Sequence, residues 1–258
     1  MRTAVKTAFP VVLMFLAAAS VHAAADGTLS VTPAVVSLRG SKGQSTKQRL
    51  VLVNNTSRDF AFDLIAQDVV VRNGKRTFVS AGEVAGSIAA TAVFSQKSVV
   101  AHPGETVAVD VTVTLPAEAQ HRGVVAIFKG TTKVMNGTVP MYASIGTLLT
   151  FATSDGVSLD AAPLEVTPQT ATKNLSIKQP CFNNGSEPLV AKSTAAIVDK
   201  DGALVGRIAL EPRRLFPTEQ TTISGEYAGE LPAGRYRVLL TFDLGAETVT
   251  RSAEVVVQ

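Results

Sequence analysis

Apolar and polar positions alternate strictly after a turn at Pro103-Gly104-Glu105. Every second residue is aliphatic from Val107 to Leu115, and threonine, alanine and aspartate fill the positions between them. This period of two predicts a half-buried strand. A second apolar run follows Gly123, and alternation from Val139 to Phe151 predicts a long third strand after a loop over residues 129–137. Three strands with short connections are typical of the closing half of an immunoglobulin-like sandwich.

The residues before this block predict more strands of the same kind. Pro33 interrupts the first of them, so we expect an edge strand or one that switches between sheets. Asn73-Gly74 predicts a tight hairpin, because both residues tolerate positive φ. A loop is expected over residues 82–91. The predicted strands are Thr28–Leu38, Gln48–Val53, Phe60–Val71 and Arg76–Val79, and residues 92–101 lead into the block described above.

Alternation lapses at Thr153-Ser154-Asp155-Gly156 and then begins again, which predicts a domain boundary. In the second half, Asn183-Asn184-Gly185-Ser186 resembles the earlier turn Asn54-Asn55-Thr56-Ser57 in position and chemistry. About seven strands per half, spaced by ~8 to 12 residues, indicate two sandwiches. The predicted fold is all-β, with two immunoglobulin-like β-sandwich domains in tandem, over residues 24–153 and 154–258. The expected strands of the second domain are Val157–Val166, Thr172–Cys181, Leu189–Val198, Leu204–Leu210, Gln220–Tyr227, Tyr236–Phe242 and Thr248–Val257.

Composition agrees with this interpretation. The chain has 258 residues, enough for two domains that each bury a core. Tryptophan is absent, only 5% of residues are aromatic, and 19 glycines and 12 prolines supply turns.

The first residues predict a cleaved signal peptide over 1–23. Arg2 and Lys6 precede an apolar run, and Val21-His22-Ala23 places small residues where a signal peptidase reads. The alternative is a transmembrane anchor, but the run is shorter than the ~20 apolar residues that a span needs. We therefore expect export to the periplasm or the cell surface, with no integral membrane anchor in the mature chain.

Charge and cysteine content narrow the classes of partner. Loss of Arg2 and Lys6 from 24 basic residues leaves 22 against 21 acidic ones, a formal charge of +1. No basic stripe with interleaved aromatic residues is present, so we expect no nucleic-acid partner.

Cys181 is the only cysteine, so an internal disulfide is impossible. It is either buried or paired with another chain, and its apolar neighbourhood favours burial.

Motifs for catalysis or metal binding are not found. The mature chain has only His102 and His121, and no His, Cys or carboxylate set has metal-ligand spacing. Asp199-Lys200-Asp201-Gly202 resembles the start of a calcium loop but lacks the later ligands, so a hairpin turn is the better interpretation. Phosphate-binding loops and a nucleophile elbow are also missing. We predict no catalytic residue, no cofactor and no metal, and therefore no enzyme.

A surface that binds another polypeptide is the remaining candidate. If the strand from Val139 to Phe151 lies at a sheet edge, its free backbone groups could take up a strand from a partner. The candidate contacts on that strand are Met141, Ala143, Ile145 and Leu149, and the preceding loop adds Lys133, Val134 and Met135. The alternative is that these side chains cover the core of their own domain.

The order of these pieces resembles a known family. Val99-Val100-Ala101-His102-Pro103-Gly104-Glu105 precedes an alternating strand, then Leu115-Pro116, a Gly-led strand and a long final strand. This order resembles the first domain of periplasmic pilus-assembly chaperones, and also the Ig-like domain of bacterial surface proteins of the WxL-interacting type. Both families place a second, smaller sandwich after the first.

The chaperone resemblance implies a boomerang of two domains that caps an incomplete pilus-type subunit by lending it the strand Val139–Phe151. It also implies an Arg on the first strand and a Lys on the last that hold the subunit's terminal carboxylate. Here the first strand has Thr32 and Pro33, and residues 139–151 contain no Lys or Arg, which leaves Arg39 or Lys133 for that role. The sequence thus favours a chaperone-like protein for secreted pilus or surface subunits. The rival hypothesis is a structural or adhesion module that binds a surface protein or glycan through its loops.

Overall fold

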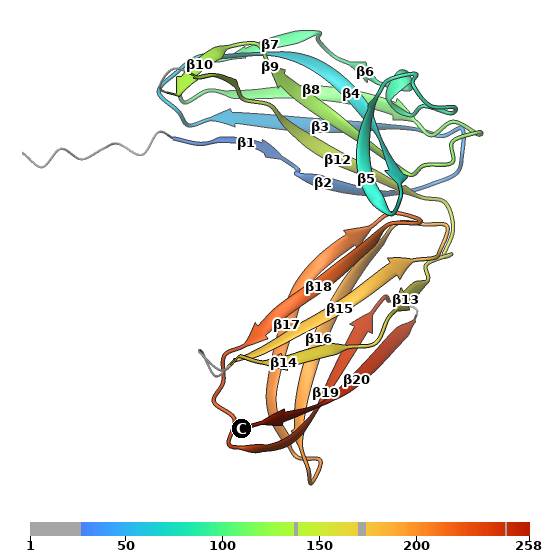
Figure 1. The fold of residues 1–258 in the computed structure, drawn as a ribbon. Coiled ribbons are helices and arrows are strands. Elements are labelled where there is room, and N and C mark those ends of the chain that lie inside the picture. The colour runs from blue at the N-terminus through green and yellow to red at the C-terminus, as the bar shows by residue number, and fades with distance from the viewer. Residues whose placement is uncertain (1–26, 137–138, 170–173, 246) are drawn as a thin grey trace, which may run out of the picture.

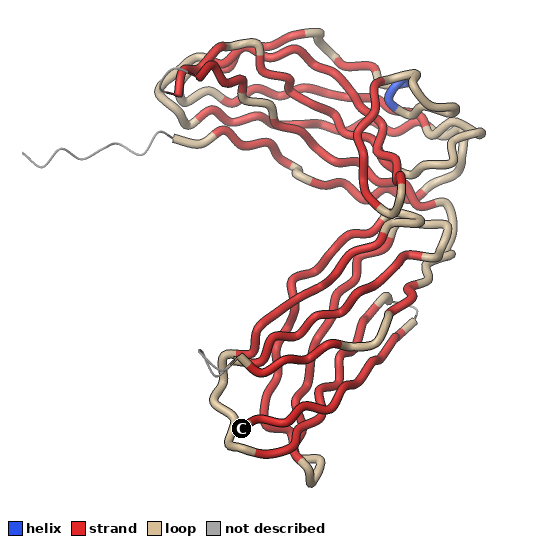
Figure 2. Tube along the Cα trace, in the orientation of Figure 1, coloured by secondary structure: helices blue, strands red, loops and turns tan. Residues whose placement is uncertain are grey.

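The computed structural model describes residues 27–136, 139–169, 174–245 and 247–258, and side chains between 134 and 140 are outside the described part. The predicted signal segment, 1–23, also lies outside it. Strands and short loops make up almost all of the described chain (Figure 2). They form two sandwiches that meet at one end and diverge from there (Figure 1). Within the described ranges, no helix is long and apolar enough to cross a membrane.

The N-terminal sandwich consists of two sheets. One has the order β1-β3-β8-β6, and the other has the order β2-β12-β9-β4-β5, with β7 beside β4. A single 3-10 turn, η1 (Ala89–Thr91), is the only helical element among its described residues. The strands are β1 (Leu29–Thr32), β2 (Val35–Arg39), β3 (Ser45–Asn54), β4 (Phe60–Arg72), β5 (Lys75–Ser80), β6 (Val93–Phe94), β7 (Ser98–Ala101), β8 (Thr106–Thr114), β9 (Gly123–Gly130), β10 (Lys133–Asn136), β11 (Val139–Tyr142) and β12 (Ile145–Ala152).

Alternation in the sequence explains which side chains fill this sandwich. Leu50 and Leu52 from β3 and the alternating valines of β8 point inward from one sheet. Phe62 of β4 and Phe128 of β9 meet them from the other, with their rings in an edge-to-face arrangement 6.1 Å apart. Burial of aliphatic and aromatic surface is the main stabilising contribution here.

The C-terminal sandwich repeats this architecture with a separate core. β15 lies between β18 on one side and β13 and β14 on the other, and the second sheet has the order β17-β16-β19-β20. Its core joins Ile177, Ile197 and Leu240, among others, from both sheets. The predicted fold class is thereby confirmed. The strands are β13 (Leu159–Ala161), β14 (Glu165–Pro168), β15 (Leu175–Asn183), β16 (Leu189–Asp199), β17 (Leu204–Leu215), β18 (Gln220–Tyr227), β19 (Gly234–Asp243) and β20 (Thr248–Val257).

The first strand changes sheets at Pro33, which is one of the two arrangements that its sequence predicted. β1 pairs with β3 in one sheet, whereas β2 pairs in parallel with β12 in the other. Proline has no N–H to donate to a ladder, so the interruption falls where the chain must leave one sheet for the other.

Two sequence predictions about the third strand of the central block need correction. The alternating run Val139–Phe151 is not one strand, because Ala143 and Ser144 separate β11 from β12. The segment expected to be a loop over residues 129–137 instead continues β9 to Gly130 and then forms β10, which pairs with β11. Alternation alone cannot detect such an interruption, since small residues fit both a strand and a kink.

Candidate functional site

The first part of β12 lies at an open edge of its sheet. On one side β12 pairs with β9 over Ile145–Thr150, but on the other it pairs with β2 only over Leu148–Ala152. The link between β1 and β2 reaches as far as Thr147, whose hydroxyl donates to the carbonyl of Pro33 at 2.7 Å. The residues of β12 before Thr147 therefore have no pairing partner in β2.

Strand geometry shows which backbone groups face this open side. Leu148 donates its N–H to the carbonyl of Ala34 at 3.0 Å, and Phe151 donates in the opposite direction, to Arg122 of the β9 side, at 2.8 Å. Successive residues of a strand direct their backbone groups to opposite sides. Gly146 therefore has its N–H and C=O on the same side as Leu148, where β2 has not yet begun.

β11 continues the open edge of β12 toward the β10–β11 hairpin. It pairs with β10 over all four of its residues, which leaves its other side without a strand partner in the described sheets. Met141 and Tyr142 expose 51% and 58% of their surface. We call residues 139–146 the free edge.

A glycine on the neighbouring strand lets the free edge approach closely. A Cβ on Gly130 would lie 1.9 Å from the carbonyl oxygen of Ala143. The N–H of Gly130 also donates to the hydroxyl of Ser144 at 3.1 Å. These contacts hold the connection between β11 and β12 against the end of β9.

The candidate contact residues differ in their accessibility. Met141 is exposed, whereas Ala143 and Ile145 are half-buried and pack against the core. Leu149 has 0% exposure and belongs to the core, in the part of β12 that β2 covers, so we leave it out of the free edge. Lys133 is exposed in β10, and the side chains of Val134 and Met135 fall outside the described residues.

The two basic residues considered for a carboxylate anchor, Arg39 and Lys133, lie in different parts of the first sandwich. Arg39, at the end of β2, is paired with Asp155 and also donates to the carbonyl of Ser154 at 3.2 Å. Lys133 lies opposite Tyr142 in the β10–β11 hairpin, on the strand that pairs with the outer part of the free edge. Arg39 therefore belongs to the connection between the sandwiches rather than to the free edge.

Ion pairs fasten the two sandwiches together at their meeting point. Arg122 Nε donates to Glu187 Oε2 at 3.3 Å, and both side chains are buried. Glu187 also accepts from the N–H and hydroxyl of Thr153 and from the hydroxyl of Ser154. Both groups are thus paired and hydrogen-bonded, as buried charges need to be.

A second contact lies beside the first. Arg76 of β5 donates to Glu219 at 3.1 Å and lies 4.9 Å from the centre of the Phe216 ring. A Cβ on Gly123 would lie 2.5 Å from the same ring, so the glycine makes room for Phe216 against the first sandwich. Sequence reasoning missed these contacts, because no local pattern links residues that are so far apart in the chain.

A hollow of about 420 Å³ opens at this junction. Its walls include Val69, His121, Arg122 and Phe216. The two ionisable side chains that line it already have partners: His121 Nε2 lies 2.9 Å from Asp68 Oδ1, and Arg122 donates to Glu187. The hollow therefore offers no free acid–base pair of the kind that catalysis uses.

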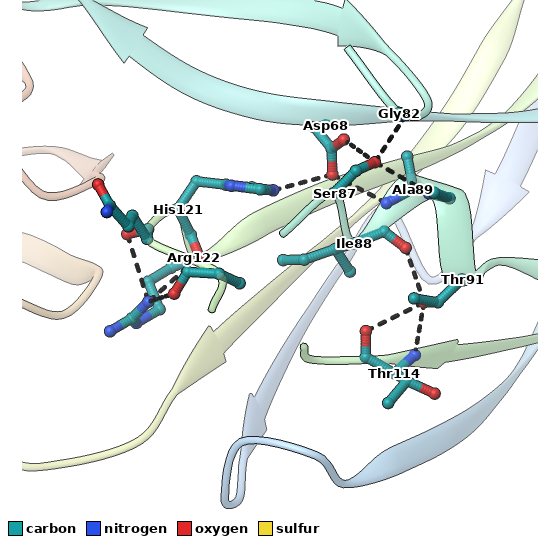
Figure 3. A network of polar contacts seen from close by, with 12 residues as sticks. Asp68, Gly82, Ser87, Ile88, Ala89, Thr91, Thr114, His121 and Arg122 are labelled. Carbon is teal, nitrogen blue, oxygen red and sulfur yellow. Dashed lines mark hydrogen bonds and ion pairs between the residues drawn. The ribbon is translucent and has the colours of Figure 1, made fainter. Parts of the chain in front are cut away.

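Ser87, Asp68 and His121 are brought together, but not as a nucleophile and its base (Figure 3). The hydroxyl of Ser87 donates to Asp68 at 2.5 Å and accepts the N–H of Gly82, so the carboxylate separates the serine from the histidine. A serine nucleophile needs its base within hydrogen-bond reach. This cluster instead holds the loop after β5 against β4.

Burial would raise the pKa of Asp68, but hydrogen bonds from His121, Ser87 and the N–H of Ala89 outweigh it and leave that pKa below its ordinary value.

Burial raises the pKa of the Cys181 thiol to about 11, so this buried cysteine is a poor nucleophile. Across the described ranges, no three His, Cys, Asp or Glu side chains are grouped so that they could hold a metal ion.

Comparison with known proteins gives similarity in structure alone. No family model and no curated protein matches the chain. The class 5 fimbriae chaperone CfaA is 12% identical, with a TM-score of 0.44, over 89% of this chain and 98% of that one. The E. coli chaperone DraB is 16% identical, with a TM-score of 0.41, over 88% and 98% of the two chains.

A third similar structure is the CsuC–CsuE chaperone–tip adhesion subunit pre-assembly complex from the archaic chaperone-usher Csu pili of Acinetobacter baumannii. It is 10% identical, with a TM-score of 0.43, over 88% of this chain and 98% of that chain. Each of these three comparisons covers most of both chains at a TM-score below 0.5.

Proposed function

We propose that this chain is a non-enzymatic, exported chaperone-like protein that binds secreted pilus or surface subunits by strand addition at the free edge. It acts in the periplasm after its signal segment is removed. The bound subunit contributes a strand that lies alongside residues 139–146, and its main-chain groups pair with those of Gly146 and its neighbours.

The observation that carries this proposal is the unfinished ladder along β12. An edge strand with free N–H and C=O groups is a template for pairing with another chain, and proteins usually cover or blunt such edges. Here β2 covers only the second part of β12, and the uncovered part continues into β11 with Met141 and Tyr142 exposed. Main-chain bonds would supply affinity, and alternate side chains would select the partner.

Co-purification from the periplasmic fraction of the native host tests the proposal. The informative variant is Met141→Asp, because Met141 is exposed and the change leaves the core intact. Ile145 packs against the core, so a charge there would confuse misfolding with lost binding. Val256→Asp is the matched control, on a valine of the other sandwich that is 55% exposed.

We expect a small β-rich subunit to accompany the unmodified protein and the Val256→Asp variant. Its recovery with Met141→Asp should fall at least about tenfold, because a charge would be buried against the added strand. If the same partner stays bound to Met141→Asp, or if no partner accompanies the unmodified protein, strand addition at this edge is wrong. A partner whose binding instead depends on loop residues would favour the rival hypothesis of a structural or adhesion module.

A further inference from the structure

The hollow of about 420 Å³ at the junction has mostly apolar walls that come from both sandwiches. Val69 of β4 and Val84, in the loop after β5, belong to the first sandwich, whereas Phe216 and Pro217 belong to the turn between β17 and β18. Small-molecule sites are typically concave and largely apolar, lie between domains and enclose roughly 300–1,000 Å³. The hollow thus has the size, the position and the lining of a binding site.

The walls of the hollow are held in place by contacts within the protein. A Cβ on Gly86 would lie 2.6 Å from the backbone nitrogen of Ala119, so the loop that contains Val84 packs closely against the segment before β9. On the opposite wall, the N–H of Glu219 donates to the carbonyl of Phe216 at 3.0 Å and closes the turn. The cavity is therefore already formed in the free protein, as it is in most ligand sites.

A strained residue completes the wall from the second sandwich. Thr218 lines the hollow and has a φ of 65°, in the left-handed region where a β-branched residue is an outlier. Its N–H donates to the carbonyl of Asn183 at 2.9 Å, which helps hold this conformation. Backbone strain of this kind is concentrated at active sites and ligand clamps.

His121 contributes a nitrogen that has no partner. Its side chain is only 9% exposed and lines the hollow, and its Nε2 lies 2.9 Å from Asp68 Oδ1 (Figure 3). An ionised carboxylate can only accept, so Nε2 carries the hydrogen, and Nδ1 of the neutral imidazole is an acceptor. Among the described residues, no donor is bonded to Nδ1, and Nδ1 is not one of the polar atoms that are sealed from solvent. It is therefore an accessible acceptor beside apolar walls.

We propose that the hollow binds a phenol, a flat apolar ring whose hydroxyl donates to His121 Nδ1. Such a ring would pack against Val84 and the aromatic ring of Phe216. A neutral ligand fits best, because His121 and Arg122 are already paired with carboxylates and a further buried charge would lack a counter-charge. The phenol is either a free small molecule or the side chain of a tyrosine in a bound polypeptide. The site is separate from the free edge.

Nitrogen-15 nuclear magnetic resonance of the histidine rings in the full mature chain tests this site, at about pH 8, where an ordinary histidine is neutral. Phenol is the probe, and anisole keeps the ring but lacks the donor. We expect phenol to shift the Nδ1 signal of His121 in a saturable manner and to leave exposed His102 unchanged. Anisole should bind about three- to tenfold more weakly, because it lacks one hydrogen bond. The absence of a saturable shift at His121, or equal binding of phenol and anisole, would overturn the proposal.

A variant that fills the hollow gives a second readout. Ala85 is exposed and lines the hollow, so Ala85→Phe would place a ring in the hollow without disturbing the core. We expect it to weaken phenol binding at least about tenfold. Ala90→Phe is the matched control, on an exposed alanine of the same connection that does not line the hollow, and it should bind phenol normally. Equal binding by both variants would contradict the proposal.

Two further probes distinguish the sources of the phenol. Tighter binding of p-cresol assigns the site to a free small molecule, and tighter binding of N-acetyltyrosinamide assigns it to a tyrosine of a polypeptide. The Met141→Asp variant should bind phenol normally, because Met141 does not line the hollow. Failure of strand addition and failure of this site are thereby distinguished.

Discussion

Two buried asparagines, one in each sandwich, have the same structural role. The Asn54 amide, 0% exposed at the end of β3, donates to the carbonyls of Arg58 and Ala101 at 2.7 and 2.9 Å and accepts the N–H of Thr56. At the end of β15, the Asn183 amide donates to the carbonyls of Glu187 and Leu215 at 2.9 and 3.1 Å. Each closes a turn and bonds to a neighbouring segment.

Replacing Asn54 by alanine tests this role. Asn54→Ala removes the amide bonds to the buried Ala101 carbonyl and to the Thr56 N–H, so we expect a loss of roughly 2–4 kcal/mol in the free energy of unfolding. Urea unfolding measures it. Asn55→Ala is the matched control, since Asn55 is exposed in the same turn. Equal losses for the two variants would show that the amide network contributes little.

The Asp68 cluster predicts a dependence of stability on pH. The pKa of Asp68 in the folded protein is below its ordinary value of 3.8. The ionised carboxylate therefore contributes fully to the stability of the fold above pH 3.8, and this contribution is lost as the pH falls through the folded pKa. Asp68→Asn should therefore make the loss of stability with falling pH shallower below about pH 4. Unfolding in urea at a series of pH values measures this.

The exposed carboxylate of Asp63 on the same strand provides the control. Asp63→Asn should keep the acid dependence of the unmodified protein. A slope that is unchanged in Asp68→Asn would contradict the assignment of the lowered pKa to this cluster.

At the scale of elements, the free edge depends on how closely β9 approaches the β11–β12 connection. Gly130→Ala would drive a Cβ against the carbonyl of Ala143, and backbone cannot move aside cheaply. We expect a loss of roughly 1–3 kcal/mol in the free energy of unfolding, together with weaker partner binding. Urea unfolding and co-purification measure the two effects.

Gly234→Ala in β19 is the control for that change. A Cβ there would meet only ordinary contacts, 3.6 Å and more from Tyr236. If Gly130→Ala were as stable as Gly234→Ala and kept its partner, the close approach would not matter to the edge.

The sequence predicted most elements because alternation directly reports which side chains face a core. The sheet switch at Pro33 and the hairpin at Asn73-Gly74 were predictable from residues with restricted or special backbone geometry. The pairing partners of β12 were not, since register depends on segments that are distant in the chain. For that reason the sequence could not show that β2 covers Leu149 and leaves Gly146 open.

At the scale of the whole molecule, we expect the buried ion pair of Arg122 and Glu187 to help fix the angle between the sandwiches. Glu187→Ala would leave Arg122 buried without its partner and would free Thr153 and Ser154. We expect a loss of about 3–5 kcal/mol in stability and a wider distribution of domain orientations. Urea unfolding and small-angle X-ray scattering measure them.

The exposed pair of Arg39 and Asp155 is the control at the same junction. Asp155→Ala should leave both the scattering profile and the unfolding curve unchanged, because solvent screens such pairs. Equal behaviour of the two variants would mean that the buried pair does not fix the angle.

Hydrogen exchange of residues 139–147 in the complex with the co-purified subunit tests strand addition most directly. In the free protein the N–H of Gly146 faces the side of β12 where the pairing with β2 has not begun, and an added strand would pair with it. We expect amide exchange in this segment to slow at least about tenfold on binding, with little change in the loops. Unchanged exchange at residues 139–147, with protection elsewhere on the surface, would contradict it.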